Sequence, residues 1–166
     1  MALIVDDALI FHGDPCEGRQ GALMTDGAAI AERAVEGAER IDARGGLVLP
    51  GLVIAHHHLY SALARGMPGP SDTPTSFREV LEKIWWRLDQ ALDEELNELS
   101  ALVGTVEALA CGVTTIVDHH ASPRAIRGSL DVVARGIVSA GARGVVCYEA
   151  TDRHGDEGFD EGLAEN

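Results

Sequence analysis

The sequence predicts an α/β protein whose larger part is built of successive βα units. Three short apolar runs, in residues 47–54, 113–117 and 142–148, lack a polar face. Such runs are typical of strands that are covered on both sides in a parallel sheet. Stretches with helical spacing separate the runs, and each run ends in polar residues. This alternation favours right-handed βα units around a parallel sheet.

Residues 1–46 form a different segment, which we expect to contain short strands joined by turns. ALIVDDALIF predicts one strand or a hairpin, and the Asp26-Gly27 pair between two apolar runs is a hairpin signal. AERIDARGG predicts a further short strand. This lead-in carries no chemistry of its own, and His12 reads as a surface histidine in or beside a loop.

The stretch from Gly45 to Ser61 reads as one buried strand that ends in three histidines. Side chains alternate along a strand, so His56 and His58 should share one face while His57 points to the other. Two imidazoles on one face make half of a metal site, which suits Zn²⁺ and also Fe²⁺. The alternative is a histidine-rich polar strand end, or a pair of hydrogen-bonded core histidines. We favour the metal because a buried histidine needs a partner.

Helices are expected between the strands. The Gly/Pro-rich residues 66–75 should form a loop that covers a substrate, and Ser76 with Glu79 predicts a capping box. From there one helix should run to Leu88 with a single apolar face, and a second should start near Asp93 and stop at Gly112. Ser122 and Pro123 predict the start of a third helix, which should end at Gly141. TDRHGDEGFDEG, from residue 151 onward, reads as an acidic loop.

The ends of the three strands share a polar character. They comprise His56–His58, Asp118–His120 and Glu149 with the residues after it. In a (β/α)₈ barrel the carboxyl ends of the strands carry the chemistry. The pattern therefore fits a barrel that has begun and has not closed, since a full barrel takes roughly 250 residues.

Composition narrows the classes of protein. The formal net charge of −14, with Lys83 as the only lysine, argues against nucleic acid or an anionic membrane as a partner. Cys16, Cys111 and Cys147 are widely spaced, which argues against a disulfide framework or a thiolate zinc site. The N-terminus does not read as a signal peptide, and no apolar run reaches membrane-spanning length. We expect a cytoplasmic protein.

These motifs resemble a known family. LVLPGLVIAHHHLYSALARGMP is similar to the strand-one signature of the amidohydrolase superfamily, in which a PGL-x-x-x-H-x-H segment supplies two metal ligands. GALMTDGAAIAER and ERIDARGG resemble the β-sandwich lead-in of its cytosine deaminase and chlorohydrolase branch. IWWRLDQALDEE, CGVTTIVDHHASP and CYEATDRHG resemble a subgroup of aminohydrolases related to guanine deaminase. The resemblance implies the N-terminal portion of a metal-dependent hydrolase barrel, with about three βα units in residues 47–166 behind a β-sandwich segment in residues 1–46.

The resemblance also assigns residues. His56 and His58 match the two family metal ligands, and Zn is the expected metal, with Fe as the alternative. His119, His120, Asp118, Glu149 and Tyr60 are candidates that line the substrate pocket or support the ligands from behind. For Asp118 and Glu149 an equal alternative is a strand-end carboxylate that caps the next helix. Alternation lets only one of His119 and His120 face the pocket. The family's acid/base residue and its later ligands cannot be placed, and we expect them beyond Asn166.

Two functions remain open from the sequence. The resemblance implies an enzyme that hydrolyses carbon–nitrogen bonds, an aminohydrolase or deaminase of a purine-like heterocycle, in which a metal-bound water attacks the ring carbon. The other is a catalytically inactive fragment, or a subunit that completes its barrel with another chain or a second copy. Exposed strand edges and apolar surface would then predict association.

Overall fold

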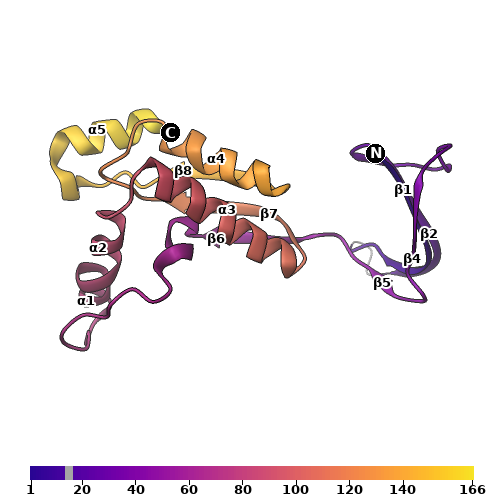
Figure 1. The fold of residues 1–166 in the computed structure, drawn as a ribbon, viewed down its shortest axis with the longest axis horizontal. Helices are drawn as coiled ribbons and strands as arrows, with labels where there is room; N and C mark the ends of the chain where they lie inside the picture. The colour runs from indigo at the N-terminus through magenta and orange to yellow at the C-terminus, as the bar shows by residue number, and fades with distance from the viewer. Residues whose placement is uncertain (14–16) are drawn as a thin grey trace. The chain divides into compact units, whose positions relative to one another are not determined.

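The computed structural model describes residues 1–13 and 17–166, so the prediction for Cys16 lies outside the described residues. In the described ranges, Cys111 and Cys147 are free thiols. The chain divides into two compact units, Met1–Pro50 and Gly51–Asn166 (Figure 1). The boundary between the units falls shortly after the boundary at residue 46 that the sequence suggested.

The N-terminal unit is a small β-structure. Its described strands are β1 (Ala2–Phe11), β2 (Gly18–Asp26), β3 (Ala29–Ile30), β4 (Glu39–Asp42) and β5 (Leu47–Val48). They follow the order β3-β2-β1-β4, and β5 also pairs with β1. The hairpin predicted at Asp26-Gly27 is present, because Asp26 pairs with Ala29 across the turn and Gly27 has a φ of 58°. Glycine adopts this left-handed conformation at no steric cost.

The prediction of a single buried strand between Gly45 and Ser61 is wrong. The run is two strands in two sheets, because β5 pairs with β1 whereas β6 (Leu52–His57) pairs with β7 (Val113–His120). Pro50 and Gly51 separate them. Gly51 packs directly on β7, where a Cβ atom would lie 2.1 Å from Oγ1 of Thr114, so a larger residue cannot take this place.

The second unit contains a parallel sheet of strand order β6-β7-β8, with β8 spanning Arg143–Tyr148. Its other described elements are η1 (Leu59–Ala64), α1 (Phe77–Val80), η2 (Leu81–Trp85), α2 (Trp86–Asp89), α3 (Glu94–Ala110), α4 (Ser129–Ala140), η3 (Asp152–His154) and α5 (Gly155–Glu165). The unit is therefore mixed α/β, and the strand–helix–strand order expected from the sequence is confirmed.

One face of this sheet is covered by α3 and α4 (Figure 1). The core comprises Leu59, Ala101, Ala108, Val113, Ile116, Val133, Ile137 and Ala142, with Ile54 and Val146 packed against it. The two helices approach closely because Gly136 has no side chain, and a Cβ atom there would lie 2.7 Å from that of Ala101. We call this side of the sheet the covered face.

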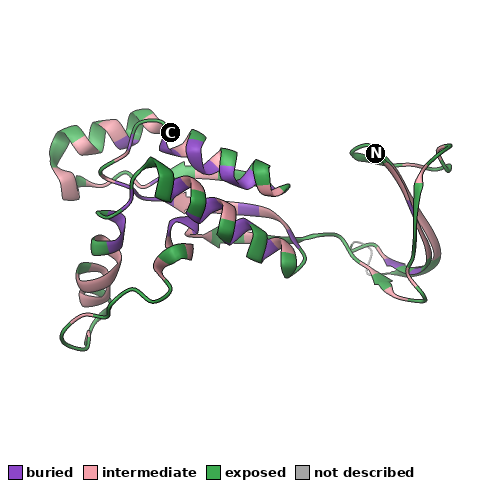
Figure 2. Cartoon of the chain, in the orientation of Figure 1, coloured by how far each residue is buried: buried purple, intermediate pink, exposed green. Residues whose placement is uncertain are grey.

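The opposite side of the sheet, the open face, is exposed in this chain (Figure 2). Val53 is 60% exposed and Val145 is 59% exposed. The expectation of strands covered on both sides is therefore wrong for the described chain. That expectation was based on the absence of a polar face in these strands. The pattern indicates that both faces are apolar, but it does not indicate what covers them.

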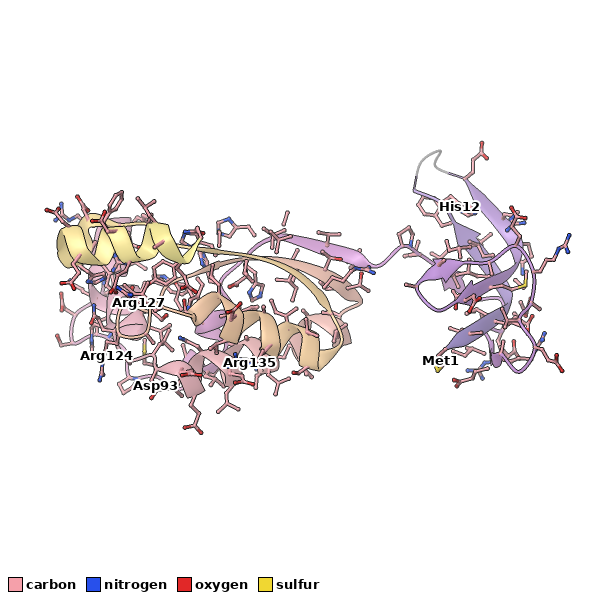
Figure 3. The ribbon with its side chains drawn as sticks, turned by 90° about the horizontal axis from the view of Figure 1, so that it is seen from above. Met1, His12, Asp93, Arg124, Arg127 and Arg135 are labelled. Carbon is pink, nitrogen blue, oxygen red and sulfur yellow. The ribbon has the colours of Figure 1, made fainter. Side chains whose placement is uncertain are left out.

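Two of the predicted helix starts are correct. Ser76 accepts a hydrogen bond from the amide of Glu79 at 3.2 Å. Asp93, which is labelled in Figure 3, accepts one from the amide of Leu96 at 2.9 Å. The first helix is not continuous, however, because the wide π-turn η2 interrupts it between α1 and α2. Such turns are often found near functional sites.

The predicted helix start at Ser122 is wrong, since α4 begins at Ser129. The hydroxyl of Ser122 donates to the carbonyl of Ala125, so it does not cap a helix. Glu165 caps α4 instead, accepting from the amides of Gly128 at 2.7 Å and Leu130 at 2.9 Å.

The prediction of an acidic loop from residue 151 onward is also wrong, because most of that segment forms α5. This helix is tied to the start of α4 by the ion pair between Arg127 and Glu161 at 2.8 Å (Figure 3). No helix in the described ranges combines the length and apolar character that a membrane crossing requires.

Candidate metal centre

The three histidines at the end of β6 are set by a β-bulge. Ile54 pairs with Ile116 and His57 pairs with Asp118, so β6 advances by one residue more than β7 over this step. Bulges of this kind re-aim side chains next to functional sites. Ile54 and His57 therefore both face the covered side, while His56 and His58 face the open side together.

His56 and His58 bring two ring nitrogens to one point. Their Nε2 atoms lie 3.0 Å apart, and their rings meet edge to face. Zinc–nitrogen bonds of about 2.0–2.1 Å, at angles between right and tetrahedral, separate two ligand nitrogens by roughly 2.9–3.4 Å. The spacing fits two ligands of one metal ion.

The ring of His58 is oriented by the neighbouring strand. Its Nδ1 lies 3.0 Å from the backbone carbonyl oxygen of His119. A carbonyl can only accept, so Nδ1 carries the proton and Nε2 has the free lone pair. Metal-binding histidines are commonly held by such a contact on the second nitrogen. The tautomer of His58 is thus the one that metal binding through Nε2 requires.

The histidine pair is incomplete as a ligand set. In residues 1–13 and 17–166 no group of three or more His, Cys, Asp or Glu side chains is arranged to hold a metal ion. Zinc sites usually have three or four protein ligands. The two histidines therefore match only part of such a site.

His119 and His120 have opposite surroundings. The ring of His119 lies beside that of His58, with centroids 5.3 Å apart. His120 is fully buried between Tyr60 and Tyr148, and its Nε2 lies 2.8 Å from the hydroxyl of Ser122. Burial lowers the pKa of His120 to about 4, and burial also lowers the pKa of His119. Only His119 joins the histidine pair on the open face.

Asp118 also lies on the covered side, where it is fully buried. Its Oδ1 accepts a hydrogen bond from the backbone amide of Leu59 at 2.6 Å. Its Oδ2 has no hydrogen-bond partner among the described residues. Nδ1 of His57 lies 3.9 Å from Oδ1. Burial raises the pKa of Asp118 to about 6, and burial followed by the neighbouring histidines lowers the pKa of His57.

Tyr60 and Glu149 lie with His58 in a cavity of about 210 Å³. Its walls are His58, Tyr60, Phe77, Leu81, Trp85, Trp86, Asp89, Glu149 and Arg153. Burial, then the charges of Glu149 and Asp89, raise the pKa of Tyr60, so its hydroxyl stays protonated and can donate. Two of the expected pocket candidates are thus brought together beside one of the expected ligands.

A charged group forms the far wall of this cavity. Arg153 donates to Asp89 at 3.1 Å and also to Glu149, and its guanidinium lies 4.8 Å from the ring centre of Trp86. Asp89 is 2% exposed, and burial raises its pKa. Asp89 was not among the residues expected at the site, because an aspartate at a helix end reads as a surface charge. The Trp85–Trp86 pair was the one local signal for this wall.

The chain shares sequence with known proteins over part of their length. No protein-family model matches the chain. A 5-methylthioadenosine/S-adenosylhomocysteine deaminase of Archaeoglobus fulgidus is 34% identical over 128 residues, which is 77% of this chain and 28% of the relative. An 8-oxoguanine deaminase of Pseudomonas aeruginosa is 30% identical over 145 residues, which is 82% of this chain and 31% of the relative. The chain thus spans about a third of the length of the relatives it matches.

Solved structures show the same fold. An adenosine deaminase from Xanthomonas campestris with bound Zn superposes with a TM-score of 0.70 at 20% identity, covering 98% of this chain and 37% of the deaminase. Other structural neighbours are an amidohydrolase and an aminohydrolase. The resemblance to the amidohydrolase superfamily that the sequence motifs indicated is confirmed, and it extends over part of the length of those proteins.

Proposed function

We propose that this chain provides the first two metal ligands, His56 and His58, of a metal-dependent aminohydrolase. The observation that carries the proposal is the convergence of the two Nε2 atoms, 3.0 Å apart, with the tautomer of His58 set by the His119 carbonyl. The relatives are named as deaminases, and one structural neighbour contains Zn. A divalent metal, Zn in the first place, fits the two imidazoles.

The proposed reaction is hydrolytic loss of ammonia from a purine-like heterocycle. His56 and His58 would help to hold a divalent metal, whose chemistry would be to lower the pKa of a water molecule that serves as the nucleophile. The residues of this chain position the substrate. Trp85 and Trp86 offer flat faces to a ring, Tyr60 offers a hydroxyl donor, and Glu149 offers a carboxylate acceptor on the same cavity as His58. The acid/base group is not assigned to any residue of this chain.

The open face supports the fold that we propose for the complete protein. Val53 and Val145 are exposed on the same side as His56 and His58, which is the side that faces inward in a (β/α)₈ barrel. We propose that β6, β7 and β8 are the first strands of such a barrel, in residues 47–166, and that residues 1–46 form a β-sandwich segment. Further strands would cover the open face and add the remaining ligands.

A second candidate is favoured by the incomplete ligand set. Because the described residues hold fewer than three converging ligands, the 166-residue chain alone would be catalytically inactive. It would then act as a fragment, or as a subunit that completes its barrel with another chain or a second copy. The small-molecule substrate would bind only in the completed assembly.

The test is the metal content of the purified chain on a sizing column, with His56→Ala, His58→Ala and His57→Ala compared. His57 is the matched control, because it belongs to the same triplet but faces the covered side. We expect about one metal per chain or per assembly, lost in the first two variants and kept in the third. Ammonia release from aminopurines and adenosine analogues then separates the enzyme from the inactive subunit.

Equal metal loss in all three variants would contradict the assignment of His56 and His58. A wild-type chain that is monomeric and metal-free at micromolar zinc would leave the subunit or fragment as the better description.

A further inference from the structure

We propose that Asp118 is a positioning residue for the histidine pair, because its carboxylate holds the backbone amide that follows His58 and so fixes the direction in which His58 leaves β6. The proposal rests on the function proposed above. It assigns a role to a side chain that lies on the face of the sheet opposite to the ligands.

The chain changes course at His58. β6 ends at His57, and the 3₁₀ turn η1 begins at Leu59 with His58 as its N-cap residue. The side chain of His58 makes no capping hydrogen bond, because its ring is directed to His56 and to the His119 carbonyl. The first amide of the turn therefore needs an acceptor from elsewhere.

Asp118 supplies that acceptor from the adjacent strand. Its Oδ1 lies 2.6 Å from the amide nitrogen of Leu59, and both groups are buried. A carboxylate at the start of a helical turn is favoured by the free amides there. The cap thus comes from a residue distant in sequence, which frees the His58 ring to bind a metal.

The Leu59 peptide is also held on its other side. Its carbonyl accepts a hydrogen bond from the hydroxyl of Ser100 at 2.6 Å. Its side chain is fully buried against Gly104, where a Cβ atom would lie 2.7 Å from Cδ2 of Leu59. Leu59 is consequently fixed in one place, and His58 is attached to that fixed point.

The same strand also holds the His58 ring. The His119 carbonyl accepts from Nδ1 of His58, and His119 is the residue after Asp118. Two consecutive residues of β7 therefore act on His58, one through its ring and one through the next amide. Loss of either contact would let the ring turn, and supporting contacts of this kind typically change metal affinity by about 10–100-fold.

A different role for Asp118 has to be separated from this one. Nδ1 of His57 lies 3.9 Å from Oδ1 of Asp118. In the alternative role, the carboxylate would act on the histidines through its negative charge alone and not through its hydrogen bond to the Leu59 amide. Asp118→Asn keeps an oxygen that can accept the Leu59 amide but removes the charge. Asp118→Ala removes both, and His57→Gln removes the imidazole alone.

The experiment uses the full chain and two measurements. Zinc affinity is measured by calorimetry, and the Leu59 amide and the His58 ring nitrogens are followed by NMR in metal-free protein. We expect Asp118→Ala to weaken zinc binding by about 10–100-fold, to shift the Leu59 amide and to mix the two His58 tautomers. Asp118→Asn and His57→Gln should stay within about threefold of wild type with the His58 tautomer unchanged, and Asp131→Ala is the exposed aspartate control.

The inference is overturned if Asp118→Ala leaves the His58 ring signals and the zinc affinity unchanged, or if Asp118→Asn is as impaired as Asp118→Ala. Should Asp118→Ala not fold, Asp118→Asn still decides: a wild-type His58 tautomer supports the positioning role and a mixed one overturns it. If wild-type protein binds no zinc, the proposed function fails, while the positioning role is judged by the metal-free NMR signals.

Discussion

The covered and open faces of the β6-β7-β8 sheet are built from alternate residues of the same strands. On the covered face, Ile116, Asp118 and His120 are fully buried, and the two polar groups have strongly shifted pKa values. On the open face, His56 is exposed and Val145 is 59% exposed. Residues one position apart thus lie in different surroundings: one set is buried beneath the helices, and the other is exposed on the side of the proposed metal ligands. The position of a residue along the strand, more than its type, decides whether its side chain is buried.

The largest expected effect is a difference in stability between two variants, each of which truncates an apolar residue on one face of the sheet. Ile116→Ala should lower the free energy of unfolding by about 2–5 kcal/mol, because it leaves a cavity beneath α3 and α4. Val145→Ala should change it by less than about 0.5 kcal/mol, since the side chain is exposed. Denaturant unfolding of the two variants measures the difference. Similar losses would show that the open face is covered in solution, by a second copy for example.

A second prediction concerns how closely α3 and α4 approach. Gly136→Ala should lower the free energy of unfolding by about 1–3 kcal/mol, because the added methyl group meets Ala101 and the carbonyl of Glu98 at 2.7 and 2.9 Å. Ser139→Ala, at an exposed position of the same helix, is the control. Thermal unfolding gives both values. A stabilised Gly136→Ala protein, as helix propensity alone would give, would mean that the helices can separate at no cost.

The smallest expected effect is a difference in how the stability of wild type and of a His120 variant depends on pH. The pKa of His120 falls from 6.5 to about 4 on folding, so the unfolded state binds more protons between these values and stability declines as the pH falls through this window. Asp118, raised from 3.8 to about 6, acts in the opposite direction. His120→Gln removes only the first contribution. Between pH 7 and pH 5 the variant should therefore lose about 1–2 kcal/mol less stability than wild type.

The measurement is urea unfolding of both proteins across that range, with His12→Gln as the exposed control. Parallel losses in wild type and His120→Gln would contradict the assignment of a buried neutral imidazole to this position.

Local signals were sufficient for part of this fold. The parallel β6-β7-β8 order, the Asp26-Gly27 hairpin and the caps at Ser76 and Asp93 follow from patterns a few residues long. Strand alternation also placed His56 and His58 together. Each of these depends on neighbours in the sequence, which is why a single sequence contains the information.

The errors concern contacts that residue type and spacing do not predict. Ser122 has the residue type and the following proline of a helix cap, but its hydroxyl is engaged by His120 and the Ala125 carbonyl. The α4 helix begins seven residues later, where Glu165 supplies the carboxylate from α5. The glycine-rich α5 read as loop because its propensity is low, and its tie to α4 through Glu161 leaves no local trace. Asp89 was missed for the same reason, since only Arg153 reveals it.

The bulge in β6 has a consequence for how relatives are aligned and how the segment tolerates length changes. A substitution between Ile54 and His57 alters one side chain, whereas deleting Ala55 would restore the regular ladder and leave the three histidines on their present faces, because His57 would still pair with Asp118. Loss of Ala55 should therefore be tolerated better than replacement of His56 or His58, because it preserves their shared face. An alignment that opens a one-residue gap at Ala55 would still equate His56 and His58 with the H-x-H pair of a relative that lacks the bulge.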